Sequence, residues 1–314
     1  MLQSTIDIVI TYDHRPKIHH IVTAEHSIST KYEAKSIMNF GRKSITVAGF
    51  MILFIANANA LPLTRAQINQ CQPHGGERNA EADLAACNAV IDSGLWRGAI
   101  LKIFIFNRGT LLAGKGNFDL ALKDFDKAIR LDRNFSMAYV GRGEIQRAKG
   151  NLDEAVKEFD QAIKSDPNNA LGYQYRAAAM ELKGNFDQAL KDYGSTINLN
   201  PDNADIYNSR CWLRATTGTD LKGALEDCNN SLKLKPDEAN TLDSRGLVNT
   251  KLGLYDKAVA DYSAALKLKE TAGALYGRGL AKRLGGDKEG GDIDIARAVK
   301  IDANVGKDYS SYGL

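Results

Sequence analysis

Apolar and small residues recur along most of the chain in a pattern that repeats about every 34 residues. One period, residues 136–169, reads SMAYVGRGEIQRAKGNLDEAVKEFDQAIKSDPNN. Its first half places Tyr139 and Gly143 at helical spacing, a turn follows at Gly150, and its second half continues in the same way until Pro167. Each period therefore predicts two helices joined by a tight turn, which is a helical hairpin.

Six successive units keep this register, and they begin at Lys102, Ser136, Ala170, Ala204, Ala239 and Ala272. Position 15 is glycine in every unit, as expected where a helix ends in the left-handed conformation that glycine adopts most easily. Position 8 is small and position 24 is large in most units, so the two helices of a hairpin should pack closely there. The sequence thus predicts an all-α chain of stacked hairpins over residues 102–305.

These residues resemble the signature of the tetratricopeptide repeat (TPR) family, which has small residues at positions 8, 20 and 27 and often proline at position 32. The resemblance implies a right-handed superhelical solenoid of helix-turn-helix repeats, whose concave groove binds a protein or an extended peptide. Residues 61–101 are then a degenerate N-terminal capping repeat, and residues 306–314 form a tail that packs on the final helix.

Members of this family line the groove with positions 5 and 9 of the first helix in each repeat. Transferred to this chain, the predicted groove residues are Phe106, Val140, Glu144, Gln174, Asn208, Trp212, Asp243, Leu247 and Tyr276. Trp212 is a candidate hot spot, because tryptophan on a binding surface often dominates affinity. The alternative is that Trp212 packs against the next repeat beside Cys211.

Two cysteine pairs occupy equivalent places in two units. Cys211 and Cys228 stand at positions 8 and 24 of the fourth good unit, which lie equally far from the turn and therefore face each other. Cys71 and Cys87 share this spacing within residues 61–101. We predict two disulfides, Cys71–Cys87 and Cys211–Cys228, each stabilising by about 3 kcal/mol. A zinc site is not expected, because four ligands would have to converge and the pairs lie far apart along the chain.

A second recurring pair combines an arginine with an acid. Position 7 is always arginine: Arg108, Arg142, Arg176, Arg210, Arg245 and Arg278. Position 23 is always acidic: Asp124, Glu158, Asp192, Asp227, Asp261 and Asp294. By the same hairpin symmetry, we expect these residues to form structural ion pairs within or between repeats. The alternative is an arginine stripe that binds a glycan or another anionic polymer.

The N-terminal residues indicate export. Residues 38–60 begin with Arg42 and Lys43, continue with an apolar run and end in Ala-Asn-Ala, which is the pattern of a signal peptide cleaved after Ala60. The apolar run is shorter than the roughly 20 residues that span a membrane, so an uncleaved anchor is the alternative. Residues 1–37 are expected to be untranslated upstream sequence or disordered. The prediction is a periplasmic or secreted protein that meets the membrane only through its signal.

Composition and charge exclude several function classes. A net charge of +3 is too small for a nucleic-acid footprint. The sequence lacks the GxxxxGK[ST], GxSxG, HExxH and CxxC motifs, and His74 is the one histidine after residue 60. We therefore expect no catalysis, cofactor, metal or small-molecule substrate; an enzyme would have to use His74. The predicted function is an exported scaffold for protein or peptide partners. The alternative is an envelope-associated structural module that binds an anionic polymer.

Overall fold

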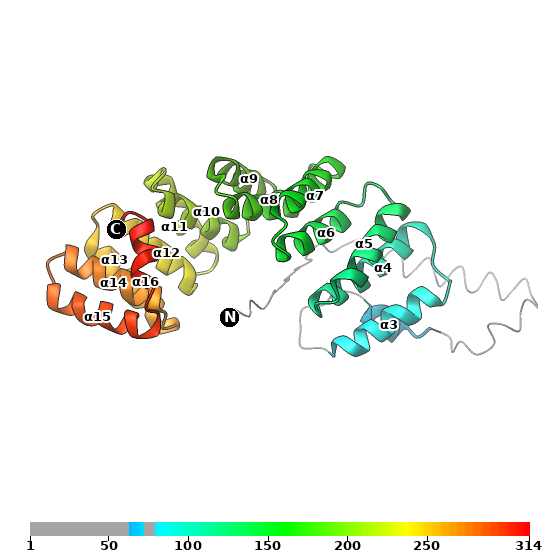
Figure 1. Cartoon of the computed structure of the whole chain (residues 1–314), viewed down its shortest axis with the longest axis horizontal. Coiled ribbons are helices and arrows are strands. Elements are labelled where there is room, and N and C mark those ends of the chain that lie inside the picture. The colour runs from blue at the N-terminus through cyan, green and yellow to red at the C-terminus, as the bar shows by residue number, and fades with distance from the viewer. Residues whose placement is uncertain (1–62, 72–78) are drawn as a thin grey trace, which may run out of the picture. The chain divides into compact units, whose positions relative to one another are not determined.

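The computed structural model describes residues 63–71 and 79–314, and all regular secondary structure in these ranges is helical (Figure 1). The signal-peptide pattern, residues 1–37 and His74 lie outside the described residues. None of the described helices is long and apolar enough to cross a membrane. The chain divides into two compact units, Met1–Leu131 and Asp132–Leu314, and each is considered by itself.

The described part of the first unit holds the capping repeat and the first good repeat. Its helices are α2 Arg65–Gln70, α3 Ala80–Asp92, α4 Gly98–Gly114 and α5 Phe118–Leu131. The α2 helix has only six residues and none of them is buried. Two contacts fix its end to the unit: Cys71 is bonded to Cys87 of α3, and its carbonyl accepts a hydrogen bond from Asn107 of α4 at 2.8 Å.

The second unit holds five hairpins and one further helix. The hairpins are α6 Ser136–Ala148 with α7 Leu152–Ser165, α8 Ala170–Leu182 with α9 Phe186–Leu199, α10 Ala204–Thr217 with α11 Leu221–Leu234, α12 Ala239–Lys251 with α13 Tyr255–Leu268, and α14 Ala272–Leu284 with α15 Lys288–Ile301. The last helix is α16 Val305–Ser311.

Each hairpin turns at the glycine of position 15, where φ lies between 71° and 104°. A side chain with a β-carbon would be strained at this angle, which explains why the glycine recurs. The fourth good repeat has one additional residue, and its turn has a different conformation. Asp220 also adopts a left-handed conformation there, with φ of 47°, and its carboxylate accepts a hydrogen bond from the Gly223 N–H at 3.0 Å.

Positions 8 and 24 meet inside the hairpins, as predicted. A β-carbon added to Gly246 would lie only 2.8 Å from the ring of Tyr262, which is fully buried. In α10 and α11 the same two positions hold the Cys211–Cys228 disulfide, with the Cα atoms 5.5 Å apart. In the capping repeat the Cα atoms of Cys71 and Cys87 are 4.6 Å apart. A covalent bond thus replaces the packing of glycine against an aromatic ring in two repeats.

Candidate functional site

The predicted groove residues all lie on the first helices of hairpins, from α4 in the first unit to α14 in the second. For Phe106, Val140 and Leu247 the prediction of an accessible side chain is wrong, because these residues are 6%, 2% and 0% exposed. Phe106 packs within its own hairpin, with its ring centroid 5.6 Å from that of Phe125. These three side chains belong to the core and leave a smaller candidate surface.

Glu144 is also buried, and the groove prediction is wrong for it as well. Its two carboxylate oxygens accept hydrogen bonds from Nε and Nη2 of Arg147, one turn along α6, at 2.8 and 3.0 Å. This pairing raises the pKa of Arg147 above its ordinary value. A carboxylate that is buried and paired within its own helix has little to offer a ligand.

The remaining predicted groove residues of the second unit are half-buried: Gln174, Asn208, Trp212, Asp243 and Tyr276. Asn208 and Asp243 occupy position 5 of successive hairpins. In each of them the side-chain Oδ1 atom is buried and has no hydrogen-bond partner. Burial raises the pKa of Asp243 to about 6. Buried acceptors of this kind are costly unless a donor reaches them.

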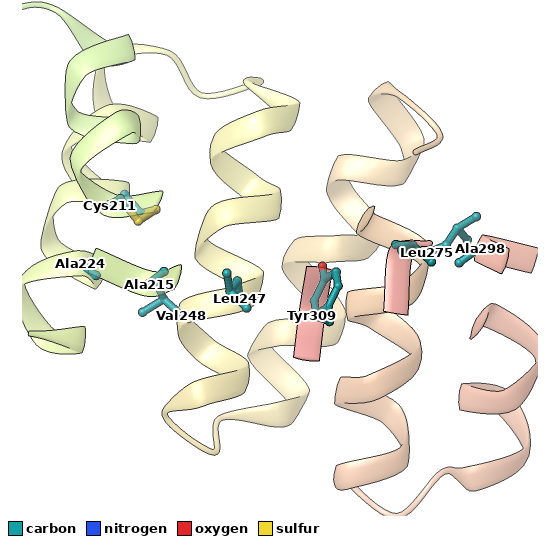
Figure 2. Close-up of a cluster of buried hydrophobic side chains, with 10 residues drawn as sticks. Cys211, Ala215, Ala224, Leu247, Val248, Leu275, Ala298 and Tyr309 are labelled. Atoms are coloured by element: carbon teal, nitrogen blue, oxygen red, sulfur yellow. A yellow bond between two sulfur atoms is a disulfide. The ribbon is translucent and has the colours of Figure 1, made fainter. Parts of the chain in front are cut away.

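The C-terminal tail, defined from here on as residues 305–314, lies on α14 and packs with side chains of α12 and α10 (Figure 1). Figure 2 shows Tyr309 of α16 between Leu247 of α12 and Leu275 of α14. Tyr309 is 3% exposed, and its hydroxyl donates a hydrogen bond to the carbonyl of Gly273 at 2.9 Å. Its ring centroid is 5.0 Å from that of Tyr276.

Tyr312 extends this contact to α10. Its ring centroid is 5.7 Å from that of Tyr309 and 5.5 Å from that of Trp212, which it meets edge-on. The predicted tail, residues 306–314, does reach the final helix of the last hairpin, since α16 contacts α15, but its tyrosines also reach back to α14, α12 and α10. Trp212 packs beside Cys211, as one interpretation held, and also faces the tail.

We name the surface formed by Asn208, Trp212, Asp243, Tyr276 and Leu280 the tail-binding face. It combines partly exposed aromatic rings with two enclosed oxygen acceptors, and all five residues lie on first helices of the second unit. Sequence reasoning named four of these residues from the family pattern. Leu280 stands at position 9 of the last good repeat, and nothing in the sequence indicated that the tail would cover this surface.

The predicted ion pairs occur in all six good repeats. In five of them, Nε and Nη2 of the arginine donate to the two oxygens of one aspartate at 2.6 to 2.9 Å: Arg108–Asp124, Arg176–Asp192, Arg210–Asp227, Arg245–Asp261 and Arg278–Asp294. Arg142 pairs with Glu158. Parallel hydrogen bonds of this type are strong and geometrically specific.

Four of these arginines also use Nη1, and this contact was not predicted. Arg176 donates to Asp160 of the preceding hairpin at 2.6 Å, and Arg245 donates to Asn229 at 3.0 Å. Arg108 and Arg278 reach Asn88 and Ser263 of the preceding repeats. Each of these arginines therefore links two repeats, and its Nε, Nη1 and Nη2 atoms all have partners within the chain.

The described residues hold no cluster of three or more histidine, cysteine or acidic side chains that could bind a metal ion. The residues whose pKa is raised include several tyrosines and two carboxylates that are wholly or partly buried. Burial raises the pKa of Tyr175 to about 12 and also raises that of Glu181, which accepts a hydrogen bond from the Tyr193 hydroxyl at 2.9 Å. Desolvation by burial is the main cause of both pKa shifts.

Comparison with known proteins agrees with the hairpin architecture. Family models described as tetratricopeptide repeat match residues 106–170, 158–191 and 239–271. No curated protein sequence matches the chain.

Several solved structures are similar to the chain. The Pseudomonas aeruginosa pilF protein aligns with a TM-score of 0.58 at 14% identity, over 68% of this chain and 96% of that one. A tetratricopeptide repeat protein from Parabacteroides merdae gives 0.51 at 15% identity, over 75% and 93%. YrrB, described as a TPR protein with an unusual peptide-binding site, gives 0.51 at 17% identity, over 60% and 98%. At these identities the likeness establishes the fold, and the predicted all-α repeat fold is confirmed.

Proposed function

We propose that this chain of tetratricopeptide hairpins is a scaffold for protein partners, which binds a short peptide segment on the tail-binding face and catalyses no reaction. The observation that supports this proposal is the seating of α16 itself. A short helix with aromatic side chains already lies across α14, α12 and α10, so this face has the shape and chemistry to hold one. Stacked helical repeats commonly bind partners on an extended surface of this kind.

The chemistry of the face indicates what a partner must contribute. Trp212 and Tyr276 offer partly exposed rings, which favour aromatic or aliphatic side chains. The enclosed oxygens of Asn208 and Asp243 favour a donor, such as an N–H or a hydroxyl group. A segment that presents both features matches the helix-in-groove mode of recognition.

The alternative, an envelope module that binds a glycan or another anionic polymer along the position-7 arginines, has less support. Those guanidinium groups are already engaged by buried or half-buried carboxylates, so an anionic polymer would have to displace an internal partner. The two functions differ in salt dependence. Polymer binding should fall steeply with added salt, whereas binding on an aromatic face should change little.

Export remains part of the proposal. Its support is the signal-peptide pattern of residues 38–60 together with two disulfides, which persist in oxidising compartments such as the periplasm or the extracellular space. N-terminal sequencing of the protein recovered from the exported fraction tests this assignment. We expect Leu61 as the first residue; an intact residue 38–60 segment would indicate the membrane-anchored alternative instead.

The binding proposal can be tested by selecting random peptides displayed on phage against the full chain. We expect enrichment of peptides with aromatic residues, and Trp212→Ala should weaken their binding at least about tenfold. Leu268→Ala is the matched control, because Leu268 is an exposed apolar residue near the end of the second helix α13. Failure to enrich any peptide, or equal losses in both variants, would overturn the proposal.

A further inference from the structure

The C-terminal tail does not continue the stack of hairpins. A further first helix stacked on the last hairpin would cover α15, but Ile293, Val299 and Ile301 of α15 are 57%, 43% and 55% exposed. Instead, Tyr312 contacts Trp212 on α10, which is the third first helix counted back from the tail, after α14 and α12. The tail therefore leaves the apolar end of the unit uncovered and lies on the face where a partner is proposed to bind.

The tail is attached by few side chains. Val305 and Tyr309 are its two buried residues, Tyr312 is half-buried, and Lys307, Asp308 and Ser310 are exposed. The α16 helix has seven residues, which is too short to be stable in water without tertiary contacts. Its helical form thus depends on docking, in which Tyr309 and Tyr312 are joined by Val305 and Leu314.

Close approach of tyrosine side chains to two glycines makes the fit specific. A β-carbon added to Gly306 would lie 3.0 Å from the hydroxyl of Tyr276, and one added to Gly277 would collide with Tyr309 and Tyr262. The two anchoring rings, Tyr309 and Tyr312, stand three residues apart and so project from the same side of a helix. The face accordingly recognises two aromatic rings at this spacing.

We propose that the C-terminal tail is a resident, displaceable occupant of the tail-binding face, and that the partner is a short amphipathic helix with two aromatic residues at i and i+3 that replaces Tyr309 and Tyr312. This inference rests on the proposed scaffold function. A partner can bind only those molecules in which the tail is undocked and the face is free. The tail therefore lowers the apparent affinity and selects for partners that match its own contacts.

The experiment uses Trp212 as a fluorescent reporter, because the chain has two tryptophans and Trp96→Phe leaves Trp212 alone. In this background we expect the full chain with Tyr309→Ala and Tyr312→Ala to show Trp212 emission at longer wavelength. A peptide of residues 302–314 should then bind this variant with one-to-one saturation and restore the emission. The chain with its tail intact should bind the same peptide at least about tenfold more weakly.

Two variants of the chain and one variant peptide separate docking from folding. Lys307→Ala alters an exposed residue of the same helix and should leave the emission and the peptide affinity unchanged. Tyr312→Ala alone removes only a half-buried ring at the end of the tail, so the chain should stay folded by circular dichroism and give an intermediate emission shift. A peptide with both tyrosines changed to alanine should not bind.

Unchanged Trp212 emission in the folded double variant, or equal peptide affinity with and without the tail tyrosines, would overturn the inference. These outcomes differ from failure of the scaffold proposal. If selected peptides bind the chain but are insensitive to the tail variants, the scaffold function stands and the resident-occupant inference fails. If no random peptide is ever enriched, the scaffold proposal fails, while Trp212 emission still reports whether the tail is docked.

Discussion

At the scale of single residues, the most regular feature is the pairing of arginine at position 7 with an acid at position 23. Asp192 illustrates why the pair persists: it is 1% exposed and accepts hydrogen bonds from Arg176 and Gln188. Taking a carboxylate out of water is costly, and these donors offset that cost. The pair fixes α8 against α9, and the further contact from Arg176 to Asp160 fixes both against α7.

Asp192→Asn should lower the free energy of unfolding by about 3 kcal/mol, because it removes the buried one of the two carboxylates that pair with Arg176 without changing the shape of the side chain. Urea denaturation followed by circular dichroism measures this change. Glu154→Gln is the matched control, since its partner Lys157 and its own side chain are both exposed. Equal stability of the two variants would show that the Arg176–Asp192 pair does not contribute to the stability of the fold.

At the scale of elements, the docking of α16 depends on what lies beneath it. Asp243 of α12 has a buried carboxylate oxygen without a hydrogen-bond partner. Its charge helps to raise the pKa of the phenols of Tyr262 on α13, Tyr309 on α16 and Tyr312, which follows α16. Burial raises the pKa of Asp243 from 3.8 to about 6. The raised value means that the packed state binds a proton more tightly than a state in which Asp243 is exposed.

Docking of the tail should therefore weaken as the pH rises from about 4 to about 6, and stay constant above this range, because ionised Asp243 disfavours the packed state. Trp212 emission in the Trp96→Phe background measures docking across this range. Asp243→Asn should abolish the pH dependence and keep the tail docked at neutral pH. A pH profile that is identical in this variant would assign the effect to another group.

At the scale of the whole molecule, the sequence predicts those contacts that recur at the same positions of each repeat. Positions 8 and 24, and likewise 7 and 23, lie symmetrically about a turn, so the Cys211–Cys228 bond and the Arg176–Asp192 pair followed from spacing alone. The contact between Tyr312 and Trp212 has no periodic signal, because it joins the tail to a helix far away along the chain. For the same reason the burial of Leu247, which packs in the cluster that contains Tyr309, could not be foreseen.

The contacts of arginine Nη1 with the preceding repeat were not predicted, for a different reason. Asn88, Asp160, Asn229 and Ser263 stand at comparable places on second helices but differ in chemistry. A pattern of residue types cannot recognise a contact that an amide, a carboxylate and a hydroxyl fulfil equally well. What the sequence predicts best is thus the geometry inside a hairpin, and what it predicts least is the surface on which one segment covers several hairpins.

The two disulfides should have separable roles, because they lie in different compact units. Cys211 is adjacent to Trp212 and belongs to the buried cluster that contains Tyr309, whereas Cys71 and Cys87 lie in the first unit. Replacing either pair by alanine should cost about 3 kcal/mol of stability in its own unit. Only Cys211→Ala with Cys228→Ala should also weaken peptide binding at the tail-binding face.

Calorimetry of each double-alanine variant and titration with the residue 302–314 peptide, in the Tyr309→Ala, Tyr312→Ala background, measure both effects. The Cys71→Ala, Cys87→Ala variant should melt earlier and bind the peptide as tightly as its parent. A variant with Cys211→Gly and Cys228→Phe restores the small-against-aromatic contact of the other hairpins, so it should recover part of the lost stability and binding. If both alanine variants lost peptide affinity equally, the binding face could not be confined to the second unit. The assignment of recognition to α10, α12 and α14 would then have to be given up.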